Sequence, residues 1–484
     1  MADVKRSDTT RYLSAAAYRD EGFRYRVIGE VVDERYRAIG PSYGIDLANI
    51  ARHCLIANRM DVMRDISLIV LLFFTVLLGL TESVFPLIPD TVLPLLAAWF
   101  VVFLRSRRTE SIVVSNFTKA TYVSESSNLP FAGKLNSYLE SRLTDIAAGQ
   151  SGNVVVYSDS RFSPFVGAGL DVPGWSFTVR IDKGKEQLGI SLEPIRFRLE
   201  DLYEYVTNRI GGLGLDGLVI EDKLYVDGQE IRDDNRFLDT PFTRPYAEVE
   251  RSLVKSFVDN PSQAVRYYKA LRVESWKGEL ILSIFLRFAQ VKSNLYAEAN
   301  YFLLPPIHAK YHKVDAIIPT PTLSRVIRQI AKVSIQTPLY LLFSPLLTLR
   351  HVLRGNARWQ QRRHMERLID RNAVFDYGAR ISIRESETSS EYRRYFQRLD
   401  KEMNFKLIEQ QILDSITEFL DSKNIDTSDL QNRQQTILNQ GVILTGGSIE
   451  AKNLSVGQGA KSQISRVTGR VGQQPQQSSK AGIH

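Results

Sequence analysis

The sequence predicts an α+β membrane protein with N-terminal helices, a transmembrane helical hairpin, a cytoplasmic antiparallel-sheet domain and C-terminal helices. Three observations predict this class. Two apolar runs stand close together at residues 66–80 and 84–104. Three strand-like segments with turn residues between them lie within residues 265–304. Apolar residues recur at steps of three and four before and after these regions, which is typical of helices that are apolar on one side.

The composition limits the class of protein and its compartment. A chain of 484 residues with 44% hydrophobic content suits a protein that folds mostly in water and carries a small membrane segment. A formal charge of +8 favours anionic partners such as lipid head groups or nucleic acid. The single cysteine excludes an internal disulfide and suits a reducing compartment. The first twenty residues are polar, so we expect no signal peptide.

Changes in composition divide the chain into six predicted segments. They are a helical region (1–60), the membrane hairpin (61–108), an α+β domain (109–322), a basic interfacial or re-entrant helical segment (323–371), C-terminal helices (372–440) and a Gly/Ser-rich, partly disordered tail (441–484).

The region before the hairpin predicts three amphipathic helices within residues 8–63. Residues 41–44 contain proline and glycine and separate the second helix from the third. The third helix continues into the first apolar run without an interrupting residue. We therefore expect it to connect the cytoplasmic helices directly to the membrane.

Arginines on both sides of the hairpin predict its orientation. They are Arg59, Arg64, Arg105, Arg107 and Arg108, whereas the connection between the two runs holds Glu82 and Asp90. The positive-inside rule then places both termini of a multi-pass protein in the cytoplasm. Each run is shorter than the roughly 20 residues that cross a bilayer, so each span needs flanking residues. A buried helical hairpin of a soluble protein would be equally apolar, and that alternative stays open.

The α+β domain shows alternating helix and strand signals. We expect helices at 134–148 and 198–210, strands at 154–157 and 175–181, a hairpin within 218–226, and a meander of strands at 265–275, 279–290 and 295–304.

Four stretches of this domain carry a resemblance to a known group of proteins. They are NVVVYS (153–158), SPFVG (163–167), GWSF (174–177) and YFLLPP (301–306). Together with the order of elements, they resemble an uncharacterised family of bacterial two-span membrane proteins with a cytoplasmic α+β domain. The resemblance covers residues 11–306. It implies this architecture and a location in the bacterial inner (plasma) membrane, and it assigns no activity and no functional residues.

The segment after this domain combines an apolar run with a row of arginines. Residues 338–349 are too few to cross a bilayer, so a re-entrant or interface-lying segment and a buried helix both remain open. A helix would place four arginines on one face, namely Arg350, Arg354, Arg358 and Arg362. This row is interpreted as a solvated face, as a contact to anionic lipid head groups, or as a site for a nucleotide or oligonucleotide.

The C-terminal part predicts a long helix and a glycine-punctuated tail. Apolar residues at steps of three and four within 399–420 indicate a helix that packs on a partner helix, either in the same chain or in a second copy. The tail resembles glycine-punctuated terminal tags on bacterial conflict proteins, and a disordered tail is the alternative.

The sequence contains no convincing signal for catalysis or for a cofactor. Residues 212–217 (GLGLDG) follow a predicted helix and precede a strand, whereas a dinucleotide-binding loop has the opposite order, so we interpret them as a helix stop and turn. His308 and His312 have the spacing of a metal-binding pair with Asp315 nearby, but no further ligand is evident. We therefore predict no enzyme, no metal and no cofactor.

These observations support two hypotheses of function. The first is an oligomeric membrane effector that forms a ligand-gated ion channel or pore, because two spans per subunit are too few to enclose a path. By architecture alone it is similar to membrane effectors of bacterial anti-phage defence. Glu82 and Asp90 would then lie at the pore mouth, although ordinary loop solvation and capping also explain them. The second hypothesis is a membrane-tethered scaffold or sensor that recruits partners without conducting ions.

Overall fold

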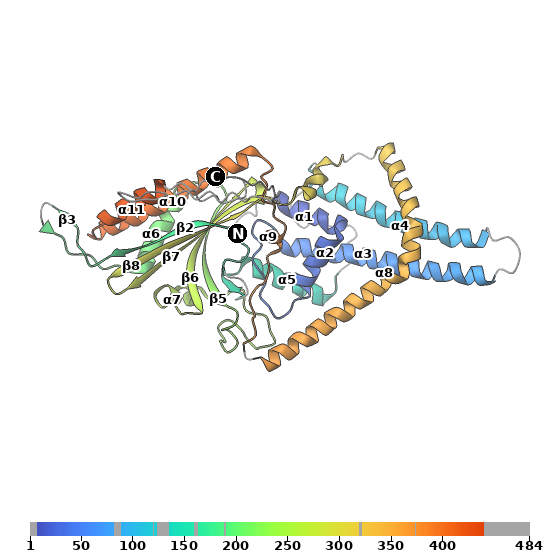
Figure 1. The fold of residues 1–484 in the computed structure, drawn as a ribbon, viewed down its shortest axis with the longest axis horizontal. Helices are drawn as coiled ribbons and strands as arrows, with labels where there is room; N and C mark the ends of the chain where they lie inside the picture. Colours follow the sequence, from blue (N-terminus) through green and yellow to red (C-terminus); the bar gives the residue numbers. More distant parts are fainter. Residues whose placement is uncertain are drawn as a thin grey trace, which may run out of the picture.

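The protein combines a sheet domain, an N-terminal helical bundle and a long helical hairpin (Figure 1). The computed structural model describes residues 7–81, 89–119, 121–122, 135–158, 163–187, 190–318, 322–372 and 374–439, with the backbone alone for residues 79–81 and 89–91. The hairpin extends away from the sheet domain, and the bundle lies between them.

The N-terminal bundle contains the helices that were predicted before the hairpin. Its elements are α1 (Asp8–Arg19), α2 (Glu21–Val27), the π-helical turn η1 (Ile28–Val32), the first half of α3 (Leu47–Thr81), the end of α4 (Pro89–Phe117) and α5 (Ser137–Ser151). The side chains of Ser7 and Asp20 accept hydrogen bonds from the first turns of α1 and α2 and so start these helices. Since α3 is one helix from Leu47 to Thr81, the predicted direct connection between bundle and hairpin is confirmed.

The sheet domain contains a six-stranded sheet in the order β1-β5-β6-β7-β8-β2. Its strands are β1 (Val154–Tyr157), β2 (Leu170–Arg180), β5 (Leu218–Asp227), β6 (Val265–Ser275), β7 (Leu280–Val291) and β8 (Asn294–Leu304), and a separate ribbon pairs β3 (Glu186–Gln187) with β4 (Ile190–Ser191). The predicted meander of three strands is confirmed as β6, β7 and β8.

Two predictions about this sheet are wrong. The sheet is mixed instead of antiparallel throughout, because β1 pairs with β5 in parallel. The predicted hairpin within residues 218–226 is a single strand, β5. Its central Glu221 and Asp222 stay in the strand because they pair with Arg272 and Lys269 on β6, which removes the need for a solvated turn.

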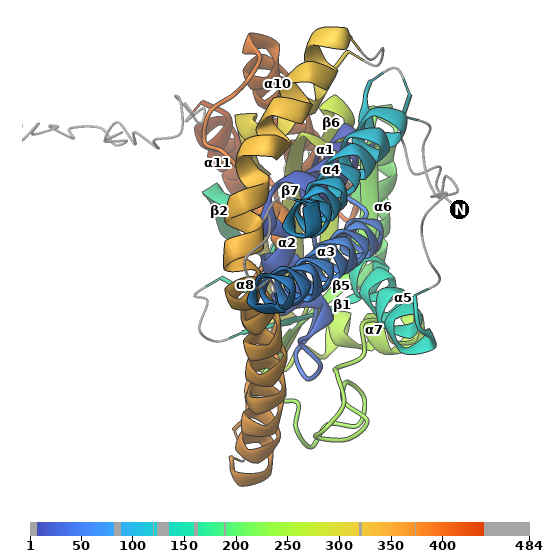
Figure 2. The same ribbon diagram turned by 90° about the vertical axis from the view of Figure 1, so that its right-hand side faces the viewer.

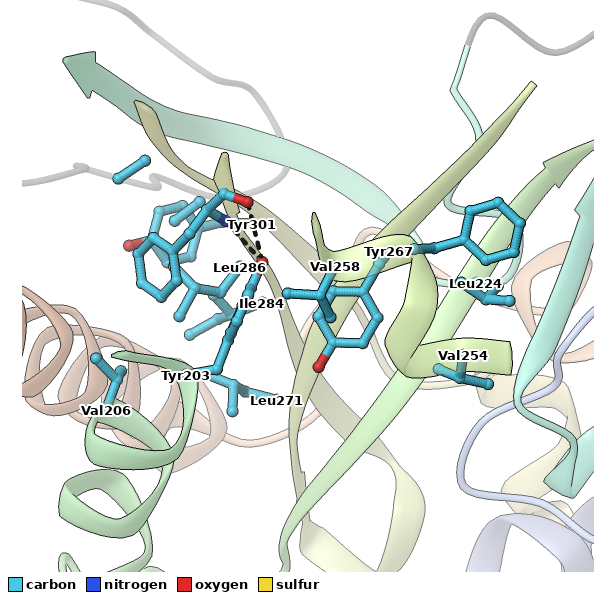
Figure 3. Packing of buried hydrophobic residues seen from close by; sticks show 14 of the residues in the cluster. Tyr203, Val206, Leu224, Val254, Val258, Tyr267, Leu271, Ile284, Leu286 and Tyr301 are labelled. Carbon is cyan, nitrogen blue, oxygen red and sulfur yellow. Dashed lines mark hydrogen bonds between the residues drawn. The ribbon is translucent and has the colours of Figure 1, made fainter. Parts of the chain in front are cut away.

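The main core lies between one face of the sheet and the helices α6 (Leu199–Gly211), α7 (Arg251–Asp259), α10 (Tyr395–Ser422) and α11 (Ser428–Asn439). Figure 3 shows Tyr203 of α6 among Tyr267, Ile284 and Leu286 of the sheet. Its buried hydroxyl accepts a hydrogen bond of 2.7 Å from the backbone N–H of Phe288. A smaller cluster on the opposite face is centred on Phe165, which stacks on Phe285.

The C-terminal helix α10 has its packing partner within the same chain. Phe405, Ile408, Ile412, Ile416 and Phe419, which define the predicted apolar row, are buried in the main core. Of the two partners that the sequence left open for this row, the structure shows the intramolecular one.

Helix α8 (Leu323–Arg371) is continuous over 49 residues and contains Pro338 and Pro345. A proline in a helix leaves the carbonyl four residues earlier without its usual donor. At Pro345 this carbonyl belongs to Leu341, and the Ser344 hydroxyl donates to it at 2.8 Å. Residues 338–349 are therefore part of one long helix, and their re-entrant or interface-lying position at a membrane stays a prediction. Figures 1 and 2 show that α8 lies crosswise to α3 and α4.

Candidate membrane module and arginine groove

Helices α3, α4 and α8 pack together at the middle of the hairpin. Leu68 of α3, Ala98 and Val102 of α4, and Val333 and Leu341 of α8 form a buried apolar cluster. Two side-chain hydrogen bonds join α8 to α4: Trp99 Nε1 donates to Ser334 Oγ at 3.0 Å, and Gln329 Nε2 donates to Ser106 Oγ at 2.9 Å. We call these three helices the membrane module.

The outer surface of the membrane module is apolar over a large area. Its exposed large hydrophobic side chains are Met63, Ile66, Val70, Phe73, Phe74, Val76 and Leu77 on α3, Val92, Leu93, Leu95, Leu96 and Phe100 on α4, and Leu323, Ile327, Ile330, Ile335, Leu339, Leu342, Phe343, Leu346, Leu349, Val352 and Leu353 on α8. Contiguous exposed apolar surface of this extent marks an interaction site, because soluble monomers rarely expose it to water.

Among the described residues, one helix is long and apolar enough to cross a membrane, and that helix is α8. The apolar ends of α3 and α4 reach residues 79–91, whose side chains lie outside the described part. The two-span hairpin therefore stays a prediction.

Buried charges join the membrane module to the N-terminal bundle. The Asp61 carboxylate pairs with Arg24 of α2, with Arg105 of α4 at 2.8 Å, and with Arg64 at 3.5 Å. One turn further along α3, Asp65 pairs with Arg64 at 2.7 Å and with His351 of α8 at 2.9 Å. We call this set the charged base of the module.

The sequence did not reveal the charged base. Arg64 and Arg105 counted as flanking positive charges in the orientation argument, yet both have carboxylate partners inside the protein. The available signal was the position of Asp61 and Asp65 immediately before an apolar run, where an acid needs a buried cation.

The four predicted arginines lie on one stretch of α8 that faces the N-terminal bundle. Arg350 pairs with Glu21 at 3.0 Å, Arg358 pairs with Asp33 at 2.8 Å, and Arg362 pairs with Glu366 at 3.1 Å. Arg354 lies 3.7 Å from Glu21, and its guanidinium stacks 3.5 Å from the centre of the Tyr25 ring. The repulsion expected between like charges is thus relieved by acids of the same chain.

Three of these arginines line a groove of about 450 Å³ between α8, η1 and α5. Its wall contains Arg354, Arg358 and Arg362 but not Arg350. The other polar and aromatic lining residues, which the sequence did not indicate, are Tyr25, Asp33, Glu34, Arg35, Tyr36, Tyr138 and Trp359. We call this cavity the arginine groove.

The remaining predicted site residues are placed as follows. Glu82 lies outside the described residues, and Asp90 is in the first turn of α4, where only the backbone is described. Of the residues considered for a metal site, His308 is exposed, His312 Nε2 lies 2.9 Å from Glu279 Oε1, and Asp315 pairs with Arg11 at 2.6 Å. Residues 212–217 follow α6 and precede β5, as the helix stop and turn predicted.

A second, smaller cavity of about 200 Å³ lies between the sheet and α10. Apolar side chains such as Val172, Leu303 and Phe405 line it, and Glu409 contributes a carboxyl group. Burial raises the pKa of Glu409 to about 7, and a hydrogen bond from the Tyr301 hydroxyl offsets this only in part. Trp175 Nε1 donates to the same hydroxyl at 2.7 Å.

The protonation of Glu409 predicts a pH dependence of stability. Between the ordinary pKa of 4.5 and the folded value of about 7, the folded protein holds a proton that the unfolded chain has released. Stability should therefore fall as the pH rises through this window. From pH 5 to pH 8, the free energy of unfolding of Glu409→Gln should fall by less than that of the wild type, and the difference should be on the order of 2 kcal/mol. Denaturant unfolding at the two pH values measures it. Glu402→Gln, at the rim of the same cavity, should behave as wild type.

A model of a protein family described as AbeC-like domain matches residues 174–451 of this chain, which is more than half of it. The match begins within β2 and includes α8 and α10, whereas the N-terminal bundle and the hairpin precede it. No curated protein and no solved structure matches the chain at a significant level.

Proposed function

Because the chain belongs to the AbeC-like family, whose description suggests abortive infection, we propose that it is a membrane effector of bacterial anti-phage defence. In this proposal the membrane module inserts into the inner membrane and the AbeC-like domain lies on the cytoplasmic side. The observation that carries it is the exposed apolar surface of α3, α4 and α8.

Charge placement supports a lipid partner for this surface. Arg325 and Arg328 stand in the first turns of α8, and Arg107 and Arg108 stand on α4 beyond its apolar run. Cationic side chains next to an apolar face are suited to anionic head groups at a bilayer surface. A soluble partner protein would require no such arrangement.

The finer part of the proposal is that several copies form a ligand-gated pore. Two spans in one subunit cannot enclose an aqueous path, so conduction requires self-association of the membrane module. The acids Glu82 and Asp90, in the predicted connection between the two spans, would then favour cations. The competing function, a membrane-tethered scaffold, predicts membrane binding without ion flux.

Vesicles of phosphatidylethanolamine and phosphatidylglycerol test both parts. We expect the purified full-length protein to float with these vesicles. When the gating ligand is present, we expect it to release potassium entrapped in them. A glutamate at an exposed apolar position of the module should reduce partitioning about tenfold or more, because a charge in hydrocarbon is costly. Phe73→Glu on α3 and Leu342→Glu on α8 are suitable changes, since both side chains are exposed and should not be needed for the fold.

Val291→Glu provides the matched control. Val291 is an equally exposed apolar residue, but it lies at the end of β7 in the sheet domain. This variant should bind vesicles as wild type does. Absence of vesicle binding by the wild type would contradict the membrane function, whereas binding without potassium release in any state would favour the scaffold. In infected cells, Phe73→Glu should abolish protection from phage and Val291→Glu should retain it.

A further inference from the structure

The arginine groove has the size and lining of a small-molecule site. Its volume of about 450 Å³ lies within the range of roughly 300–1,000 Å³ that is common for ligand pockets. Four guanidinium groups and two carboxylates line it, so the wall carries an excess of positive charge. These groups belong to Arg35, Arg354, Arg358 and Arg362, and to Asp33 and Glu34.

The arginines of the groove face the N-terminal bundle and not the apolar surface of α8. With 3.6 residues per turn, the exposed Leu349, Val352 and Leu353 lie on roughly the opposite side of α8 from Arg354 and Arg358. The contacts of the two arginines with Tyr25 and Asp33 agree with this placement. A lipid bilayer that contacts the apolar side would therefore not reach the groove.

Aromatic rings beside these arginines offer surfaces for a planar group. Arg354 lies over Tyr25, Arg35 lies 4.8 Å from the centre of the Tyr138 ring, and Arg363 lies 4.5 Å from the centre of the Trp359 ring. Trp359 is 56% exposed at the edge of the groove, which is unusual for so large an apolar side chain. Bases stack on such rings, and neighbouring guanidinium groups bind phosphate.

We propose that the arginine groove binds a phosphate-bearing aromatic small molecule of the nucleotide class. The phosphate would take the place of Asp33 at Arg358, and the base would stack on Trp359 or Tyr138. Such an exchange is feasible because Asp33 is poorly solvated: its burial raises the pKa of the carboxyl group despite the nearby arginines. In the absence of ligand, the ion pair of Arg358 with Asp33 holds α8 against the end of η1.

Ligand binding in the arginine groove would act on the membrane module through α8. The same helix lines the groove with Arg354 to Arg362 and contributes Val333 and Leu341 to the cluster with α3 and α4. A ligand that separates α8 from η1 would change the position of α8 on the hairpin. This regulatory consequence rests on the proposed function, whereas ligand binding itself does not.

Binding is measured on the full-length protein in detergent, where no bilayer is needed. The probes are ATP, cyclic di-AMP, adenosine, inorganic phosphate, glycerol 1-phosphate and a ten-residue oligothymidylate. We expect ATP or cyclic di-AMP to raise the melting temperature and to quench the fluorescence of Trp359, and Trp359→Phe should lose this quenching. Arg358→Gln should weaken binding at least tenfold. Arg354→Glu combined with Arg358→Glu should abolish it.

Arg367→Gln is the matched control, because Arg367 is exposed on α8 and is not part of the groove wall. It should leave the affinity unchanged. Equal effects of Arg358→Gln and Arg367→Gln, or no response to either nucleotide at millimolar concentration, would overturn the assignment. Glycerol 1-phosphate that binds as tightly as ATP would assign the groove to lipid head groups instead, and tighter binding of the oligothymidylate would assign it to nucleic acid. Vesicle flux is measured separately, so the proposed function and the ligand site can fail independently.

Discussion

Replacement of Asp61 by asparagine is expected to lower the free energy of unfolding by about 3–5 kcal/mol, because it leaves buried arginines without their counter-charge. Arg24 and Arg105 both pair with this carboxylate, and their side chains are almost fully buried. Asparagine keeps the shape of the side chain but offers a neutral oxygen. Denaturant unfolding in detergent, followed by far-ultraviolet circular dichroism, measures the loss.

Asp239→Asn is the control, because Asp239 is exposed in the sheet domain and the change removes the same charge. It should change the free energy of unfolding by less than about 0.5 kcal/mol. If Asp61→Asn and Asp239→Asn unfold at the same denaturant concentration, the charged base does not hold the hairpin to the bundle. A second readout is vesicle binding: Asp61→Asn should retain it, because the apolar surface is unchanged.

Replacement of Arg384 by methionine is expected to destabilise the protein by about 3 kcal/mol or more, because it leaves buried carbonyl groups without donors. Arg384, in the short helix α9 (Ile383–Ser386), is fully buried. Its Nη2 donates to the carbonyl oxygens of Glu279 and Pro305, both at 2.9 Å, and lies 3.4 Å from that of Gly278. Burial lowers the pKa of this guanidinium to about 9. These bonds join α9 to the start of β7 and the end of β8.

Arg196→Met is the control for this prediction, since Arg196 is exposed in the loop before α6. Chemical denaturation should show a lower midpoint for Arg384→Met and an unchanged one for Arg196→Met. An unchanged midpoint for Arg384→Met would mean that the cost of burying the cation equals the gain from its hydrogen bonds.

Patterns that depend on neighbours in the chain were predictable from the sequence. The meander β6–β8 followed from alternation and turn residues, and the continuity of α3 followed from an uninterrupted helical period. The single strand β5 was missed because Glu221 and Asp222 look like turn residues until Arg272 and Lys269 are placed opposite them. Cross-strand pairs of this kind join residues that are far apart in the sequence.

The arginine groove was predictable only in part for the same reason. A helical period places Arg350, Arg354, Arg358 and Arg362 on one face of α8, and three of the four line the groove. Apart from Glu366 on α8 itself, their acidic and aromatic partners come from α2, the C-terminal end of η1 and α5, more than 200 residues earlier in the chain. Nothing in the local sequence around Asp33 or Tyr138 indicates that α8 lies against them.

The crosswise position of α8 has a geometric consequence for insertion. From Leu68, where α8 contacts α3, the described part of α3 continues for thirteen residues to Thr81, which is about 20 Å at 1.5 Å per residue. If α3 and α4 stand upright in the bilayer, α8 lies along the lipid head groups and stops the hairpin from inserting further. The position of α8 then limits how deep α3 and α4 insert, and a shift of α8 would move both helices relative to the bilayer.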